Sequence, residues 1–276
     1  MNINTKKTGL ALAVPAALLL GWAAAENLAL LHVSRYETDF AAMPRTVQIS
    51  DLHKRSFGRG QKRLIRTVAA LEPELIVITG DLVSRTELDF KNTAELLEKL
   101  CAIATVIVAE GNHEADLSPG AYAGFRDAVR KSGARLLDNE IVRWGDISIA
   151  GLRLPPTYYR GGGILGARGK YECTAGTLWE RLGSCPPDTL LLAHNPRWFP
   201  AYAEWGARLT LSGHIHGGIV RLPGIGGILS PERTFFPRFA KGLYTSGNAE
   251  MIVSGGLGKL RLFNPPEICL ITPKTD

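Results

Sequence analysis

The sequence is poor in cysteine and lacks the spacing of common cysteine motifs. Its 276 residues include four cysteines, and no two of them form a CxxC pair. This excludes a zinc ribbon and a thioredoxin-type site. Cys101 and Cys269 stand in apolar surroundings, where we expect buried thiols. Cys173 and Cys185 lie in a loop-rich stretch, and two interpretations stay open for them: a disulfide if the domain faces an oxidising compartment, or two free thiols.

Several catalytic motifs are absent as well. The run His113–Leu117 lacks the second His of the HExxH motif, and the chain contains no HxHxDH run and no Walker A sequence. These absences exclude a zinc-protease helix, a metallo-β-lactamase-type site and a P-loop. The glycines at 224–227 do not form GxGxxG and no helical pattern follows them, so we expect a loop there.

The composition is that of a globular protein with an excess of positive charge. Hydrophobic residues make up 45% of the chain and charged residues 21%, and the formal net charge is +6. A disordered chain would have fewer apolar residues. The positive charge favours anionic partners, such as phosphate esters, acidic lipid surfaces or nucleic acid, without choosing among them.

The amino terminus carries the one long apolar run of the sequence. Residues 10–25 are all apolar or small, and Lys6 and Lys7 precede them. We expect residues 1–28 to be a membrane anchor, residues 29–44 a linker and residues 45–276 the folded domain. The alternative is a cleaved signal peptide, since the alanines at 23–25 suit signal peptidase. With the two lysines inside the cell, the domain would lie on the extracytoplasmic side of the cell membrane, or be secreted after cleavage.

The remaining pattern alternates between strands and helices. Strands are predicted at 46–50, 75–79 and 105–109, with helices at 61–71, 88–100 and 125–131. Further strands are predicted at 141–150, 189–193, 208–212, 251–254 and 267–272. Early alternation followed by a strand-rich second half indicates a mixed α/β fold with two packed sheets.

Five predicted strands are each followed by residues that can bind metal. The segments after these strands are Asp51-Leu-His53, Gly80-Asp81, Gly111-Asn112-His113-Glu114, His194-Asn-Pro and Gly213-His214-Ile-His216-Gly-Gly. Ligands and catalytic groups collect at the carboxyl ends of strands in α/β folds, because these ends share one edge of a sheet. A single Asp-x-His or Gly-Asp is ordinary turn chemistry, so it is the joint occurrence that indicates a site.

Carboxylate, imidazole and amide oxygen suit divalent ions such as manganese, iron, zinc or cobalt. Seven such ligands are too many for one ion whose coordination must stay open to substrate. They suit two ions about 3.5–4 Å apart that share a bridging carboxylate. The candidate ligands are Asp51, His53, Asp81, Asn112, His194, His214 and His216.

In their order along the chain, these segments resemble those of the calcineurin-like metallophosphoesterase superfamily. A finer resemblance is to its bacterial branch with an amino-terminal membrane or export segment, based on residues 49–53, the glycines after His216 and residues 263–268. The resemblance implies an α/β fold in four layers, a two-sheet β-sandwich flanked by helices. One departure is Gly255, where many relatives carry Arg after the Ser.

The resemblance also implies roles for the candidate residues. Asp51, His53, Asp81 and His216 would hold the first ion, and Asp81 would bridge to a second ion completed by Asn112, His194 and His214. His113 would protonate the leaving oxygen or stabilise the transition state. The implied reaction is hydrolysis of a phosphoester or pyrophosphate bond. Relatives of this branch include enzymes acting on lipid-linked or nucleotide-sugar pyrophosphates, such as UDP-diacylglucosamine.

A basic and aromatic segment follows the double-histidine loop. It contains Arg221, Arg233, Arg238 and Lys241, interleaved with Phe235, Phe236 and Phe239. Such a rim would rest on an anionic membrane surface or grip a lipid phosphate, or it is an ordinary loop whose phenylalanines pack inward.

Two other functions stay open. A broad phosphodiesterase or nuclease would fit the positive charge, although no aromatic and basic strand pattern of RNA-binding type is present. An inactive scaffold for protein partners would be expected to lose ligands, and here all eight positions are filled.

Overall fold

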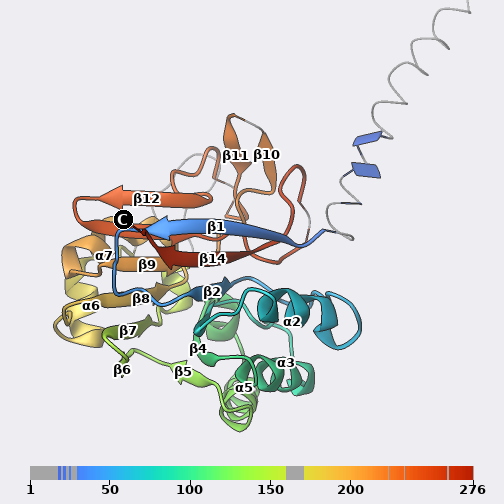
Figure 1. Cartoon of the computed structure of the whole chain (residues 1–276), viewed down its shortest axis with the longest axis horizontal. Coiled ribbons are helices and arrows are strands. Elements are labelled where there is room, and N and C mark those ends of the chain that lie inside the picture. Colours follow the sequence, from blue (N-terminus) through green and yellow to red (C-terminus); the bar gives the residue numbers. More distant parts are fainter. Residues whose placement is uncertain are drawn as a thin grey trace, which may run out of the picture.

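Two six-stranded sheets pack face to face in the computed structural model, with helices on both outer faces (Figure 1). The structure describes residues 18–19, 21–22, 25, 30–159, 171–222, 224–232, 234–259 and 261–275. In strand order, the first sheet contains β1 (His32–Thr38), β14 (Glu267–Pro273), β2 (Thr46–Ile49), β3 (Leu75–Thr79), β4 (Thr105–Ala109) and β5 (Arg135–Leu137). The second contains β12 (Gly242–Ser246), β13 (Ala249–Val253), β9 (Leu209–Ser212), β8 (Thr189–Ala193), β7 (Ile147–Leu152) and β6 (Glu140–Trp144).

The central strands β2, β3, β8 and β9 are buried along their whole length because both of their faces are covered. In β3, Val77 packs between the two sheets, whereas Ile76 and Ile78 pack under helices. The helices on that side are α2 (Lys62–Ala69), α3 (Lys91–Cys101) and α5 (Pro119–Lys131). On the other side, α6 (Ala175–Leu182) and α7 (Phe199–Trp205) cover the second sheet. The predicted four-layer α/β fold is therefore confirmed.

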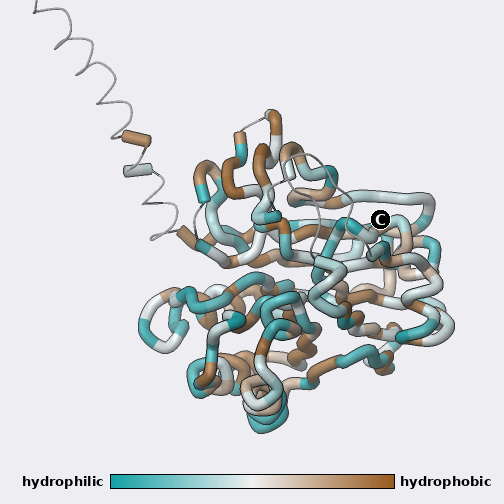
Figure 2. Tube along the Cα trace, turned by 180° about the vertical axis from the view of Figure 1, so that it is seen from behind, coloured by the Kyte–Doolittle hydropathy of each residue, from teal (hydrophilic) through white to brown (hydrophobic). Residues whose placement is uncertain are grey.

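The helices are amphipathic, as the layer arrangement requires. In α3 the buried residues are Thr93, Leu96, Leu97 and Leu100, on the face toward the sheet. Figure 2, which shows the molecule from behind, has both hydrophobic and hydrophilic residues along the helices of the lower part. Helix α5 begins at Pro119 because the Ser118 hydroxyl caps it by accepting a hydrogen bond from the Ala121 N–H.

The strand pairing brings one set of strand ends to one edge of the molecule. β2, β3 and β4 are parallel neighbours, and so are β7, β8, β9 and β13 in the other sheet. Their carboxyl ends are joined by hydrogen bonds between loops, such as Asp51 N–H to Gly80 O at 3.1 Å and Gly213 N–H to His194 O at 3.0 Å. The two sheets meet where His194 Nδ1 lies 2.6 Å from Thr79 O. All five predicted ligand-bearing loops start from this edge.

Four sequence predictions need correction. The linker predicted at 29–44 contains β1, which pairs in parallel with β14 and so belongs to the domain. The strand predicted at 141–150 is a hairpin, β6 and β7. The helix predicted at 125–131 begins earlier, at its Ser118 cap. The loop predicted at 224–227 belongs to the two-stranded hairpin of β10 (Val220–Leu222) and β11 (Gly226–Leu229).

The anchor predicted at residues 1–28 lies almost wholly outside the residues that the structure describes. Within the residues that are described, no helix combines the length and apolar character needed to span a bilayer.

Cys173 and Cys185 are both free thiols, which excludes the disulfide interpretation in this structure. Cys269 is buried as predicted, and Cys101 is partly buried.

Candidate metal centre

The strand-end loops bring six of the seven predicted ligands into three overlapping groups. The groups are Asp51, His53 and His216; His53, Asp81 and His113; and Asp81, His194 and His214. Within each group, the possible ligand atoms all lie within 4.8 Å of one another. The groups share His53 and Asp81, so the side chains form one continuous cluster. The seventh predicted ligand, Asn112, lines a cavity together with members of this cluster such as His53, Asp81 and His214.

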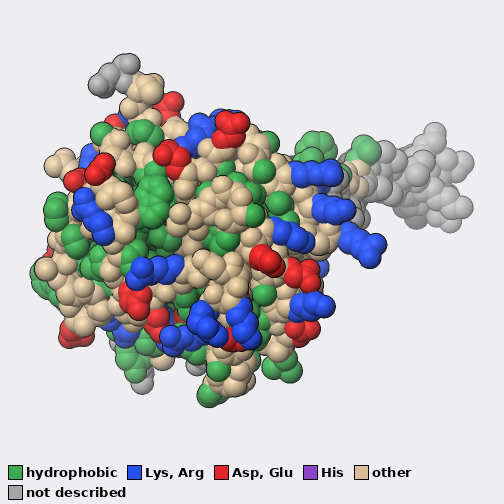
Figure 3. Space-filling model, turned by 60° about the horizontal axis from the view of Figure 1, so that its bottom comes forward, with side chains coloured by type: hydrophobic (Ala, Val, Ile, Leu, Met, Phe, Trp, Pro, Cys, Tyr) green, Lys and Arg blue, Asp and Glu red, His purple; other side chains and the backbone are tan. Residues whose placement is uncertain are grey.

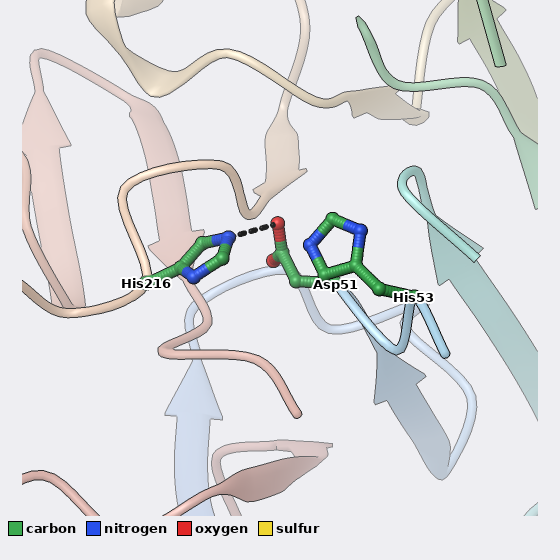
Figure 4. Close-up of side chains that lie close together, drawn as sticks. All are labelled: Asp51, His53 and His216. Carbon is green, nitrogen blue, oxygen red and sulfur yellow. Dashed lines mark ion pairs between the residues drawn. The ribbon is translucent and has the colours of Figure 1, made fainter. Parts of the chain in front are cut away.

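The two carboxylates are the centre of this cluster. Asp81 Oδ2 lies 3.4 Å from His194 Nε2, 3.8 Å from His113 Nε2 and 3.9 Å from His53 Nε2. Asp51 Oδ1 lies 3.1 Å from His216 Nε2, and Figure 4 shows His216 and His53 on either side of that carboxylate. Two ligands on one ion with bonds of about 2.1 Å are separated by roughly 3–3.4 Å. The distances around both carboxylates are therefore close to those of metal ligands.

The backbone at five of the ligands is left-handed. The φ angles are 54° at Asp51, 51° at His53, 52° at Asp81, 68° at His214 and 56° at His216. A non-glycine residue in this region is strained by about 1–3 kcal/mol. Such strain gathers at functional sites, where the surrounding structure holds it in place.

Two glycines allow the loops to approach one another. A Cβ at Gly80, whose φ is 95°, would lie 2.6 Å from His194 Nδ1 and 2.7 Å from Gly111 Cα. A Cβ at Gly111 would lie 2.7 Å from the Asp81 backbone nitrogen. Because real Cβ atoms do not come this close to backbone atoms, only glycine lets these loops bring Asp81 and His194 together.

Glu114 fixes the loops that carry Asp81 and Asn112. Its buried carboxylate accepts hydrogen bonds from the N–H groups of Asp81 at 2.9 Å, Gly111 at 2.8 Å and Val83 at 3.1 Å. Burial raises the pKa of Glu114 to about 7, with a further contribution from the nearby Asp81 charge. Glu114 is therefore a positioning residue. The sequence showed it as part of the Gly-Asn-His-Glu run but did not predict this role.

Asn264 has a similar role beneath the double-histidine loop. Its Nδ2 donates to His216 O at 2.5 Å and to Gly218 O at 2.9 Å. The side chain is fully buried. Asn264 belongs to the segment 263–268 on which the family resemblance was partly based. Its contacts could not be predicted from the sequence, because they depend on how distant loops meet.

The electrostatics of the cluster fit a cation. Burial alone would raise the pKa of Asp51 and of Asp81, but the neighbouring histidines outweigh it and lower both. Burial lowers the pKa of His194, yet Asp81 and Asp51 outweigh it and raise this pKa to about 10. The two buried carboxylates therefore require positive charge nearby, which a proton on His194 supplies in this state. A divalent cation would supply it and leave His194 neutral, as a ligand must be.

Two buried polar atoms point to the same conclusion. Asn112 Oδ1 has no hydrogen-bond partner among the described residues, and His194 Nε2 makes no hydrogen bond although Asp81 Oδ2 lies 3.4 Å away. Buried polar atoms are rarely left in this state. Both belong to predicted ligands, and both would be satisfied by a metal ion.

His113 is held in one tautomer at the edge of the cluster. Its Nδ1 accepts a hydrogen bond from the Arg85 N–H at 3.2 Å, so in the neutral ring Nε2 carries the hydrogen. Burial lowers the pKa of His113 to about 4, against an opposing effect of Asp81. At neutral pH His113 thus presents an uncharged Nε2–H group to the cavity.

The cavity over the cluster has a volume of about 250 Å³. Its lining includes His53, Asp81, Asn112, His113, His214 and His216 of the cluster, and also Arg85, Tyr159 and Glu232. Tyr159 and Glu232 were not singled out from the sequence. Tyr159 packs edge-to-face on His214 with ring centres 5.1 Å apart, and Glu232 Oε1 lies 2.7 Å from His214 Nε2.

The predicted basic and aromatic rim is smaller than the sequence suggested. Lys241 Nζ forms a 2.6 Å ion pair with the buried Glu267, and Phe239 packs against the core. Phe235 and Phe236 are exposed, at 52% and 63%, and Arg238 is exposed beside them. Arg221 is partly buried, and Arg233 lies outside the described residues.

Comparison with known proteins places these observations in a family. The sequence profile of calcineurin-like phosphoesterases matches residues 44–218. The chain is 29% identical to the uncharacterised metallophosphoesterase YkuE of Bacillus subtilis, over 84% of this chain and 79% of that protein. It is 26% identical to the phosphodiesterase YaeI of Escherichia coli, over 87% and 86%. It is 24% identical to the UDP-2,3-diacylglucosamine pyrophosphatase LpxG of Chlamydia muridarum, over 94% of each.

Among solved structures, the protein TT1561 of Thermus thermophilus shares the fold. The TM-score is 0.50 at 12% sequence identity, and the match covers 78% of this chain and 91% of that one.

Proposed function

Because this chain belongs to the calcineurin-like phosphoesterase family, we propose that its buried cluster holds two divalent cations and hydrolyses phosphoester or pyrophosphate bonds of anionic substrates at a membrane. The chain is a metal-dependent phosphoric ester hydrolase. The number of ions, the residue roles and the substrate are what the proposal adds.

The observation that carries the two-ion proposal is the position of Asp81. Asp81 belongs both to the group with His194 and His214 and to the group with His53 and His113, and His53 in turn belongs to the group with Asp51 and His216. Its Oδ2 lies 3.4 Å from His194 Nε2 and 3.9 Å from His53 Nε2, and these two histidines belong to different groups. A carboxylate so placed can bridge two ions, as dinuclear hydrolytic sites require. Asn112 would complete the second set.

Bound divalent cations would supply Lewis-acid chemistry, because they lower the pKa of a coordinated water and neutralise charge on the phosphoryl group. The protein contributes fixed geometry. The strained turns and the Glu114 carboxylate hold the ligands before any ion arrives, so little reorganisation is needed on binding.

We assign His113 the role of a hydrogen-bond donor toward the reacting phosphoryl group. Its Nε2–H faces the cavity, and its low pKa keeps the ring neutral near pH 7. Nearby cations would lower this pKa further. Of the two roles that the sequence left open, stabilisation of charge that develops on oxygen is therefore favoured over delivery of a proton.

For the substrate, we propose a phosphate or pyrophosphate ester with a lipid portion. The likeness to LpxG, whose name records a UDP-2,3-diacylglucosamine pyrophosphatase, supports this class. So do the exposed Phe235 and Phe236, which follow the cavity residue Glu232 by three and four positions in the sequence and precede the exposed Arg238. The predicted amino-terminal anchor would keep the cavity near the bilayer, with the domain on the extracytoplasmic side.

The alternative is a broad phosphodiesterase or nuclease, which the likeness to YaeI favours. On the face shown in Figure 3, however, Lys and Arg are interspersed with Asp and Glu and do not form a continuous basic stripe. An inactive scaffold is the third candidate, and the complete ligand set argues against it.

The full-length chain should be purified, stripped of metal, and reloaded with Mn²⁺ or Zn²⁺ in counted equivalents. We expect two ions per chain, and activity that appears only with metal. Bis-p-nitrophenyl phosphate, p-nitrophenyl phosphate and a UDP-linked lipid would separate diesterase, monoesterase and pyrophosphatase activity. Turnover that survives complete chelation would contradict the proposal. Preference for DNA or RNA over the UDP-linked lipid would favour the nuclease alternative.

Membrane contact is tested separately. Replacing Phe235 and Phe236 by Ser should weaken binding to anionic vesicles without changing turnover of a soluble diester. Leu88→Ser, at a residue that is 81% exposed and precedes α3, is the matched control.

A further inference from the structure

Glu232 reaches the metal centre from a loop that carries none of the predicted ligands. It follows β11, and its Oε1 lies 2.7 Å from His214 Nε2. Both side chains are nearly buried, with exposed fractions of 12% for Glu232 and 8% for His214. A contact this short and this shielded is a strong hydrogen bond between imidazole and carboxylate.

The ring of His214 is fixed from several directions. Its backbone N–H donates to both carboxylate oxygens of Asp51 at 3.2 Å, which fixes the backbone from which the side chain extends. Tyr159 packs edge-to-face on one side of the ring. Glu232 then holds the Nε2 corner. Of the two ring nitrogens, Nε2 is occupied by this hydrogen bond, and Nδ1 is the one left for a cation.

The Glu232 carboxylate decides which ring nitrogen of His214 carries the hydrogen. An ionised carboxylate only accepts hydrogen bonds, so Nε2 must donate. The neutral ring then has its lone pair on Nδ1. Metal-bound histidines commonly use this arrangement, in which a carboxylate holds the far N–H and makes the ligand nitrogen more basic.

We infer that Glu232 is a positioning residue that makes His214 bind the cation of the Asp81 and His194 group through Nδ1. The inference rests on the proposed function, because it requires a cation in that group. Glu232 is not a ligand in this arrangement. It sets the tautomer and the orientation of the ligand.

The first test measures Zn²⁺ affinity of the full-length chain by competition with a chromogenic chelator. Glu232→Ala should weaken one of the two binding steps by about 10–100-fold. Glu232→Gln keeps a carbonyl oxygen that accepts the same hydrogen bond, so its loss should be smaller. Glu180→Ala, at an exposed position of α6, is the control. Circular dichroism of each variant checks that the fold is intact.

The second test reads the tautomer directly. Long-range ¹H–¹⁵N spectra of the Zn²⁺-loaded chain, labelled at histidine, should show His214 with hydrogen on Nε2 and metal on Nδ1. The His214→Gln spectrum identifies the signals. A metal-bound Nε2 would overturn the inference, and so would unchanged Zn²⁺ affinity in Glu232→Ala. If the wild-type chain binds fewer than two Zn²⁺ ions, the proposed function itself fails, and the two failures are thereby distinguished.

Discussion

Replacing Glu114 should destabilise the loops of the metal centre although Glu114 is not a predicted ligand. Its carboxylate accepts three hydrogen bonds, from the N–H groups of Asp81, Val83 and Gly111. In Glu114→Ala these three buried donors lose their acceptor. Each such loss costs roughly 1–3 kcal/mol.

One effect acts in the opposite direction. Burial and the Asp81 charge raise the pKa of Glu114 to about 7, so the ionised carboxylate is itself unfavourable in this site. Its removal recovers part of the loss. We therefore expect Glu114→Ala to lower the free energy of unfolding by roughly 3–5 kcal/mol, in the lower part of the summed range.

The measurement is urea unfolding of the metal-free chain at pH 8, followed by circular dichroism. Glu114→Gln should lose less, because its one carbonyl oxygen can still accept from Asp81 and Gly111, as Oε2 does now. Its amide group would face the Val83 N–H, donor against donor. If Glu114→Ala loses less than about 1 kcal/mol, the network does not support the loops as described.

Three further predictions concern the ligand cluster. His113→Ala should keep both ions, counted by atomic emission, but lose about 10²–10³-fold in turnover, since it removes only a donor to the reacting group; loss of metal would contradict this role. Asp81→Asn should lose metal and activity together, because the neutral amide lacks the negative charge that a carboxylate bridge between two cations supplies; full metal content would refute the bridge. In the metal-free chain, burial lowers the pKa of His194 but Asp81 and Asp51 raise it to about 10. Its stabilising charge is therefore complete below the unfolded value of about 6.5 and lost as pH rises through about 10. Unfolding free energy in chelator should fall between pH 7 and 10, and His194→Gln should flatten this decline.

The centre of the fold could be predicted from the sequence because its signals are local. The run Leu75–Ile78 is apolar at every position, and the ligand Asp81 follows three residues after its end. The ligands are therefore placed by strand ends alone. Parallel pairing then brings those ends to one edge without further information.

The rest depended on contacts between distant parts of the chain. β1 alternates polar and apolar residues weakly, and it is a strand because β14, from the other end of the domain, lies beside it. Glu232 and Asn264 are ordinary loop residues in sequence. They acquire their roles only because their loops fold back onto His214 and His216.

The left-handed turns at the ligands also limit how this centre can vary. Besides glycine, the residues that adopt such a backbone most readily are Asn, Asp and His. All five left-handed ligand positions hold Asp or His. Glutamate would offer the same carboxylate and cysteine a better ligand for zinc, but neither suits that backbone as well. The left-handed turns therefore favour Asp and His at these positions, in addition to the preference of the metal for their side chains.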